Sequence, residues 1–371
     1  MKITELETLF VRPRWLFLKM HTDADIVGWG EPIVEGWSRT VAAAVEEMGR
    51  YLIGKDPRRI EDHWQAIYRG GFYRGGPVLT SALSGIEQAM WDIKGKALGV
   101  PVYDLLGGAV RDRIRVYGHV GWSHRESYLE PKTPDAAAGF TVVKTALFQA
   151  VQFVEPPAFV EEVARRMADL REAFGDEVDI GVDFHGRVGP TMAIELAEAL
   201  EPYGPMFIEE PVLPGNVDAL ARVARSTCIP VATGERLFTR WAFREVLEKE
   251  AAAILQPDLS HAGGIWEVRK IAAMAEPYYA AIAPHCPLGP ISLAAALQVD
   301  ACTPNFVAQE HVNLGVGYLE RPFTIEDGCI PLPAGPGLGI EVDEEAVREK
   351  TYDGTWDNPR LRHEDGSVAD W

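Results

Sequence analysis

The segments VDIGVDFH (178–185), MFIEE (206–210) and PVATGE (230–235) decide the fold that we predict for this chain. Each is a short run of β-branched and apolar residues with an acidic residue at or near its end, and helix-like sequence separates one run from the next. Further runs of this kind lie on both sides: IRVYGH (114–119), FTVVK (140–144), AAAILQPD (251–258), YYAAIAPH (278–285) and NFVAQE (305–310). The alternation predicts an α/β fold with a parallel (β/α) barrel of the TIM type, in which Pro131 and Pro134 interrupt the helix after the first run.

Polar residues gather at the carboxyl ends of these runs. They are His119, Lys144, Asp183, Glu209, Glu235, Asp258, His285 and Glu310. Most neighbours in this series are about 25 residues apart, roughly the length of one strand–helix unit, so they are expected at one rim of the barrel. Active sites of such barrels are built at that rim.

The two ends of the chain have a different pattern. Residues 1–112 are typical of a small α+β unit, with strands at Ile3 to Val11, Trp15 to Met20 and Ile26 to Gly30, then helices at 39–52 with Ser38 as its cap, at 60–68 and at 80–98 ending at Gly99. Residues 320–371 lose the alternation and gain proline and glycine. Because so short a segment has little core of its own, we expect this tail to return to the first unit and the barrel to occupy 113–319.

Composition excludes several classes of partner. The chain has 371 residues and a formal net charge of −19, and an acidic surface repels phosphate backbones, so nucleic acid is not expected. No apolar run approaches the ~20 residues of a membrane span, no signal peptide is visible, and the four cysteines lack metal-type spacing, so the predicted location is the cytoplasm. An anionic substrate would need a local cation, either a bound metal or a side chain such as Lys144, which could contact a substrate carboxylate.

Three carboxylates favour a metal site. Asp183, Glu209 and Glu235 follow consecutive strands and would repel one another if they were not neutralised. A hard divalent cation removes that repulsion, and few oxygen ligands with open positions suit Mg²⁺. Any one of the three could instead cap a helix or pair with an arginine. Glu210 should point to the opposite face of its strand from Glu209, so the pair is poor evidence for a glycoside hydrolase.

Histidines and further carboxylates at the same rim predict acid–base chemistry. Asp258 and His285 end adjacent strands, so the carboxylate can orient the imidazole and make it a stronger base. His185 follows Asp183 by two positions, which places it beside the metal as a candidate acid. Glu310 ends the last strand and could hydrogen-bond an oxygen of an intermediate or close the barrel through a salt bridge.

The chain resembles the galactonate dehydratases of the mandelate racemase subgroup of the enolase superfamily. The matching stretches are VGWGEP (27–32), GFYRGGP (71–77), WDIKGK (91–96), DFHGRV (183–188), FIEEPV (207–212), GER (234–236), ILQPDLSHAGGI (254–265), APHCPLGPI (283–291) and RHEDGSVADW (362–371). They cover most of the chain. The resemblance implies a modified barrel under a capping domain built from both ends of the chain, and it assigns the roles of the rim residues as follows: Mg²⁺ on Asp183, Glu209 and Glu235; His285 as base, assisted by Asp258; His185 as acid; Glu310 as stabiliser.

The implied reaction is loss of water from a sugar acid, catalysed by a hydro-lyase. His285 removes the C2 proton, the metal spreads the charge that develops, and the C3 hydroxyl leaves with a proton from His185. D-Galactonate would give 2-dehydro-3-deoxy-D-galactonate. Loops of the first domain that carry Arg14, Trp37 and Tyr73 would cover the site and bind the distal hydroxyls. A homo-oligomer is expected for a barrel family of this kind.

Two regions depart from the family, residues 122–160 and residues 314–336. Racemases of the superfamily carry a second catalytic lysine where Ala146 stands, and galactonate dehydratases carry an asparagine. Ala146 can neither take a proton nor donate a hydrogen bond, and one base facing one acid favours elimination over racemisation. The alternatives are a dehydratase for another aldonate such as gluconate, an epimerase, and a non-catalytic sugar-acid binding protein.

Overall fold

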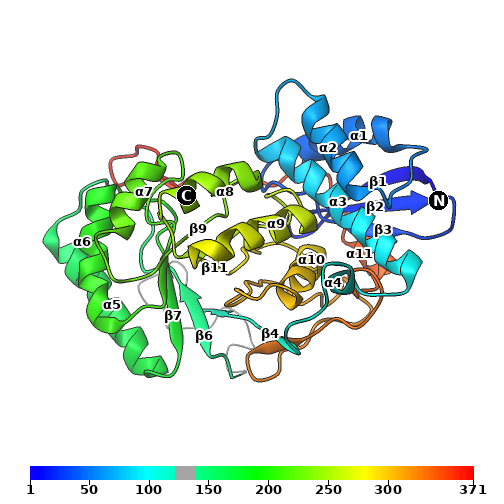
Figure 1. Cartoon of the computed structure of the whole chain (residues 1–371). Helices are drawn as coiled ribbons and strands as arrows, with labels where there is room; N and C mark the ends of the chain where they lie inside the picture. The colour runs from blue at the N-terminus through cyan, green and yellow to red at the C-terminus, as the bar shows by residue number, and fades with distance from the viewer. Residues whose placement is uncertain (122–138) are drawn as a thin grey trace.

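The structure is a computed structural model that describes residues 1–121 and 139–371, so the predicted break at Pro131 and Pro134 lies outside the described residues. An N-terminal α+β unit lies beside an α/β barrel (Figure 1). The sheet of the N-terminal unit is antiparallel, in the order β1 (Ile3–Val11), β2 (Trp15–Thr22) and β3 (Gly28–Gly30). Its helices are α1 (Ser38–Leu52), α2 (Ile60–Gly70), α3 (Pro77–Leu98) and the short α4 (Val102–Leu105).

Helix α3 forms the core of the N-terminal unit. Its residues 80–93 are all buried, because the sheet covers one side of the helix and the barrel another. Strand β3 packs directly on its backbone: a Cβ atom at Gly28 would lie 2.1 Å from the Ala89 carbonyl oxygen, and one at Gly30 would lie 1.9 Å from that of Gly85. Only glycine permits so close an approach of strand and helix.

The barrel is a parallel sheet in which β5 to β11 follow one another in order, with helices on its outer face (Figure 1). Its strands are β5 (Gly118–His119), β6 (Val142–Thr145), β7 (Asp179–Asp183), β8 (Phe207–Glu209), β9 (Val231–Thr233), β10 (Ile254–Leu255) and β11 (Ala281–Ile282). The helices between and after them are α5 (Pro157–Phe174), α6 (Pro190–Leu200), η1 (Glu201–Tyr203), α7 (Val217–Ala224), α8 (Thr239–Glu248), α9 (Ile265–Ala275), η2 (Glu276–Tyr278) and α10 (Pro290–Ala301).

The predicted last strand, 305–310, is not a regular strand in the structure but still joins the two ends of the sheet. The backbone N–H of Val307 donates to the Ile282 carbonyl at 2.8 Å, and that of Gln309 donates to the Arg115 carbonyl at 2.9 Å. The segment therefore bridges β11 to the residues just before β5. The predicted fold class, a modified barrel with a capping domain, is confirmed.

Two elements near the end of the chain pack on its earlier strands. Strand β12 (Cys329–Pro331) pairs antiparallel with β4 (Arg113–Arg115), which takes up the start of the first predicted barrel run. Helix α11 (Glu344–Glu349) lies against β1. There Arg348 pairs with Glu7 at 2.9 Å, an exposed ion pair that contributes little stability compared with the apolar packing around it.

Two buried glutamates of the N-terminal unit dock it on the barrel. Glu31 accepts the N–H groups of Gly289 at 2.7 Å and Ser292 at 2.9 Å, at the N-terminus of α10. Glu87 of α3 accepts the N–H of Ile265 at 2.7 Å, at the N-terminus of α9. The first N–H groups of a helix have no partner inside it, and the helix dipole favours a carboxylate there. Burial raises the pKa of Glu31 and of Glu87 to about 8, although the backbone donors act to lower it.

Some boundaries differ from those predicted. Helix α1 begins at Ser38 itself, and its N-cap is Trp37 without a side-chain hydrogen bond, so the prediction of Ser38 as the cap was wrong. Helix α3 begins at Pro77, because proline fits the first turn of a helix, and it ends at Gly99 as predicted, with a φ of 72°. None of the helices within 1–121 and 139–371 combines the length and the apolar character that a membrane span requires.

Candidate active site

The carboxyl ends of β7, β8 and β9 bring the three predicted metal ligands to one rim. Asp183 and Glu209 end their strands and are partners in the parallel register, and Glu235 follows β9 by two residues. The exposed fractions of these residues are only 1%, 0% and 9%. The neighbouring Glu210 follows the end of β8 with a φ of 43°, and it accepts hydrogen bonds from Nε of Arg236 at 3.0 Å and from the Gly234 N–H at 3.1 Å.

Lys144 lies among these carboxylates. Its Nζ is 2.8 Å from Oε1 of Glu209, 2.9 Å from Oε1 of Glu310 and 4.0 Å from Oδ2 of Asp183. Burial acts to lower the pKa of Lys144, but the charges of Glu209 and Glu310 outweigh it and raise the pKa well above its usual value. Lys144 is therefore a charged partner of protein carboxylates, and its predicted contact with a substrate carboxylate stays a prediction.

The carboxylates are only partly neutralised by this lysine. Burial raises the pKa of Glu209 to about 8 and that of Asp183 to about 6, even though Lys144 acts to lower both. Burial also acts to raise the pKa of Glu235, but the charge of His285 outweighs it and lowers that pKa overall. Buried carboxylates with raised pKa values are groups whose ionised form a further cation would stabilise.

The donor chemistry of Asp183, Glu209 and Glu235 fits a hard divalent cation, because all three offer carboxylate oxygens from adjacent strands. Within the described residues, however, no three histidine, cysteine or acidic side chains stand close enough together to hold a metal ion. The Lys144 ammonium lies between two of them instead. The residues therefore suit the cation by their chemistry.

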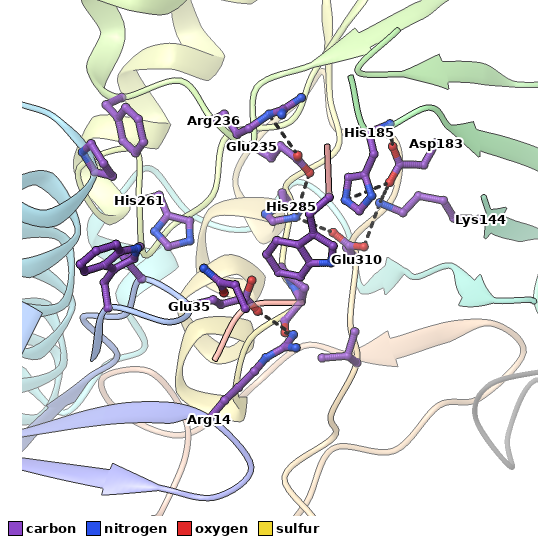
Figure 2. Close-up of a pocket in the computed structure, with 18 of the residues that line it drawn as sticks. Arg14, Glu35, Lys144, Asp183, His185, Glu235, Arg236, His261, His285 and Glu310 are labelled. Atoms are coloured by element: carbon purple, nitrogen blue, oxygen red, sulfur yellow. Dashed lines mark hydrogen bonds and ion pairs between the residues drawn. The ribbon is translucent and has the colours of Figure 1, made fainter. Parts of the chain in front are cut away.

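His285 is held between three carboxylates. Its Nδ1 lies 2.8 Å from Oδ2 of Asp258. Its Nε2 lies 3.2 Å from Oε2 of Glu235 and 3.8 Å from Oε2 of Glu310 (Figure 2). Asp258 is fully buried and also accepts the Ser260 N–H at 2.7 Å, which fixes its orientation. Burial acts to lower the pKa of His285, but the charges of Glu310 and Glu235 raise it well above its usual value. The Asp258–His285 pair thus has the geometry of an oriented base, and the base role requires the negative charge around the ring to be neutralised so that this pKa falls.

His185 follows β7 in a left-handed backbone conformation, with a φ of 55° that is uncommon for a residue other than glycine. Its backbone N–H donates to Oδ1 of Asp183 at 2.7 Å, and its Nε2 lies 3.8 Å from Oδ2 of the same residue. Arg187 can only donate, so its Nη2 at 2.9 Å makes Nδ1 of His185 an acceptor and leaves the proton of the neutral ring on Nε2. Burial lowers the pKa of His185 to about 4, so an acid role requires a negative substrate to raise it.

Glu310 connects several of these groups. One oxygen pairs with Lys144 and lies 3.3 Å from Nε2 of His119, and the other accepts the Cys286 N–H at 3.0 Å. Burial acts to raise the pKa of Glu310, but the charges of Lys144 and His285 lower it well below its usual value. Glu310 is therefore ionised and firmly positioned beside the base.

A cavity of about 660 Å³ lies above these residues, and three parts of the chain line it. Figure 2 shows Lys144, Asp183 and His185 on one side of the cavity, with His285 and Glu310 next to them, and Arg14 and Glu35 of the N-terminal unit on the other. The third part is the tail, which contributes Asn358 and Trp371.

The structure brings most of the predicted site residues together. The lining contains the predicted residues Lys144, Asp183, His185, Glu235, His285, Glu310, Arg14 and Trp37, while Glu209 and Asp258 lie buried behind it. Tyr73 is apart from this group: it is 87% exposed on the loop between α2 and α3. Ala146 follows β6 and also lies outside the lining.

Glu35, His261, Asn358 and Trp371 are among the lining residues that were not predicted as site residues. His261 and Trp371 lie in stretches that match the family, so a motif signal was present for both. Glu35 and Asn358 come from irregular segments, where periodicity gives no indication of which way a side chain points.

Comparisons with known proteins agree along the whole chain. Residues 8–107 match the family model of the mandelate racemase / muconate lactonizing enzyme N-terminal domain, and residues 133–346 match that of the enolase C-terminal domain-like family. The D-galactonate dehydratase of Ralstonia nicotianae is 52% identical over the full length of both chains. That of Xanthomonas euvesicatoria is 50% identical, again over the full length of both.

Solved structures show the same architecture. An enolase from Agrobacterium radiobacter, crystallised with bound sodium and L-malate, is 31% identical with a TM-score of 0.91 over 100% of both chains. A mandelate racemase/muconate lactonizing enzyme-like protein from Roseovarius is 37% identical with a TM-score of 0.88 over 99% of each chain.

Proposed function

The chain belongs to the mandelate racemase / muconate lactonizing enzyme family of the enolase superfamily, and on that premise we propose that it is a hydro-lyase that converts D-galactonate to 2-dehydro-3-deoxy-D-galactonate and water. The observation that supports this most strongly is that His285, oriented by the buried Asp258 behind it, lines one cavity with His185 and two of the three rim carboxylates. Relatives that share about half of their residues with this chain over its full length carry the same activity by name.

Asp183, Glu209 and Glu235 would hold a divalent cation, Mg²⁺ by their all-oxygen chemistry. When bound, the cation supplies positive charge at the carboxylate end of the substrate, where negative charge develops as the C2 proton leaves. Sodium and L-malate in the Agrobacterium enolase support a site for a cation and a small hydroxy acid in this fold.

In the proposed reaction Nε2 of His285 takes the C2 proton, because Nδ1 is committed to Asp258. The electron pair of the C2–H bond forms the C2–C3 double bond, and the C3–O bond breaks. His185 donates the proton with which the hydroxyl leaves as water, and the resulting enol ketonises. Glu310, held by Lys144 and the Cys286 N–H, would stabilise an oxygen of the intermediate.

The alternatives are weaker. Ala146 offers no second base, which argues against an epimerase or racemase. A non-catalytic binding protein has no use for a buried carboxylate that orients a histidine. Another aldonate such as gluconate is the nearest alternative and would keep the same reaction. We also propose that residues 1–112 and 320–371 cap the barrel at 113–319, since both ends contribute to the lining.

The test is turnover of a panel of sugar acids with Mg²⁺ present, with keto-acid product as the readout. D-Galactonate should have the highest kcat/KM. A much higher value for gluconate or another epimer would change the substrate and leave the reaction class standing. No turnover of any aldonate, by folded protein with metal, would overturn the proposal.

A further inference from the structure

The tail builds an ordered support for one aromatic side chain of the cavity. Residues 361–369 form a hairpin in which the Ala369 N–H donates to the Leu361 carbonyl at 3.0 Å. Gly366 makes the turn with a φ of 86°, which glycine adopts without strain. Ala369 is only 7% exposed, so it anchors the hairpin, and the chain that follows places Trp371 in the lining of the cavity.

Trp371 connects the barrel side of the cavity to its N-terminal side. Its ring centroid lies 6.5 Å from that of His185 and 6.3 Å from that of Trp356. The Arg14 guanidinium lies 5.1 Å from the Trp356 ring centroid and pairs with Glu35 at 2.6 Å. A continuous series of contacts therefore runs from the candidate acid to the loops of the capping unit.

The side of the cavity next to Trp371 has the composition of a site for a polyhydroxylated chain. Arg14 and Glu35 line it, away from Lys144 and Asp183 in Figure 2. Asn358 lines it too and is tightly placed, since a Cβ atom at Gly36 would lie 2.6 Å from its Nδ2. Guanidinium, carboxylate and amide groups take part in hydrogen bonds with hydroxyls, whereas the face of an indole packs against C–H groups.

We propose that Trp371 is a specificity-determining residue, which packs against the C–H groups of the distal carbons of the sugar acid while Arg14, Glu35 and Asn358 bind their hydroxyls. This inference rests on the proposed function. Of these carbons, C4 and C5 each carry one hydrogen and one hydroxyl. An epimer at such a carbon turns its hydroxyl towards the face of the indole. There the hydroxyl gives up its hydrogen bonds to solvent and gains no new partner. Trp371 thus makes substrate binding depend on the configuration of carbons that take no part in the elimination.

The test compares Trp371→Ala and Trp371→Phe with wild type, using D-galactonate, or the aldonate that the wild type prefers, and its C4 and C5 epimers. Trp371→Ala should raise KM for the preferred aldonate about tenfold and leave kcat within about threefold, because a distal contact binds substrate and transition state alike. The preference over the epimers should shrink by a similar factor. Trp371→Phe keeps an aromatic face and should retain most of the preference.

Trp241→Ala is the matched control. Trp241 is 43% exposed and stacks on Tyr68 with centroids 5.2 Å apart, outside the cavity, so its loss removes an indole without touching the site. Its KM should equal that of the wild type. Circular dichroism and melting temperature establish that each variant is folded. Trp371→Leu, which has no aromatic face, carries the test with the same expected effect if Trp371→Ala does not fold.

Unchanged KM and unchanged epimer preference in folded Trp371→Ala or Trp371→Leu would overturn this inference and leave the proposed function intact. A fall in kcat at constant KM would also overturn it, since that result assigns Trp371 to the positioning of His185. No turnover of any aldonate by the wild type is the distinct result that removes the proposed function and this inference together.

Discussion

Replacing Asp258 with asparagine tests the proposed base with almost no change in volume. The Oδ1 atom of Asp258 accepts the Ser260 N–H at 2.7 Å, and an asparagine carbonyl can keep that bond. Its amide nitrogen would then face Nδ1 of His285, which lies 2.8 Å from Oδ2 in the native enzyme. Because an amide nitrogen only donates, Nδ1 must accept, and the proton of the neutral ring moves to Nε2. A ring protonated at Nε2 cannot take the C2 proton.

The size of the effect has two parts. A hydrogen bond to a charged group contributes about 1.5 to 3 kcal/mol, which corresponds to a roughly 10- to 150-fold loss of rate. The wrong tautomer adds to this, and a total loss of about 10³ to 10⁴ in kcat is typical when an orienting carboxylate behind a catalytic histidine becomes an amide. KM should change little, because Asp258 lies behind His285 and outside the lining of the cavity.

The assay follows keto-acid formation and, in D₂O, the appearance of deuterium at C2 of recovered substrate. Both should fall together in Asp258→Asn. Asp179→Asn is the matched control, since Asp179 also belongs to a barrel strand but is paired with Arg115 at 2.8 Å, far from the rim. An Asp258→Asn enzyme with kcat within about threefold of wild type would refute the assignment of Asp258 as the residue that orients the base.

Three further predictions follow from the same geometry. Glu235→Gln should nearly abolish turnover without unfolding the protein, as should excess chelator on the wild type; full activity under chelation, measured as keto-acid formation, would contradict the metal requirement. His185→Asn should exchange C2 hydrogen with D₂O while forming little product, and His285→Asn should do neither; NMR of recovered substrate decides, and the opposite pattern would reverse base and acid. Because burial raises the folded-state pKa of Glu87 to about 8, its stabilising contribution is complete below the unfolded pKa near 4.5 and is lost as pH rises through 8. The decrease in unfolding free energy between pH 5.5 and 8.5, measured by urea unfolding, should therefore be smaller in Glu87→Gln than in the wild type by on the order of 3 kcal/mol, and an equal decrease in both proteins would count against it.

The rim of the barrel was predictable because it depends on local order. A strand that ends in a polar residue places that residue at the carboxyl edge, so Asp183, Glu209 and His285 could be brought together from spacing alone. Local signals also predicted the bounds of β1, from its alternation of β-branched residues, and the end of α3, from the left-handed Gly99. Motif resemblance then supplied the family, which the comparisons confirm.

The rest of the cavity depends on tertiary contacts that no local pattern encodes. Arg14 and Trp37 reach the lining from the capping unit, whereas Tyr73, on a loop chosen by the same reasoning, stays exposed. Trp371 reaches it because a hairpin in the tail folds back over the barrel. The segment 305–310 joins the sheet by single bridges instead of a full strand, since its hydrogen bonds are shared between two different neighbours.

The arrangement of lysine and arginine side chains in the cavity bears directly on the proposed metal requirement. The lysine and arginine side chains that line it in the described residues are Arg14, Lys144 and Arg236. Each is already paired with a protein carboxylate: Arg14 with Glu35, Lys144 with Glu209 and Arg236 with Glu210. A substrate carboxylate would have to displace one of these buried partners and leave it uncompensated, which costs several kcal/mol. In a chain with a net charge of −19, favourable binding of a sugar acid therefore requires additional positive charge at the rim, and carboxylates with raised pKa values are where a divalent cation would supply it.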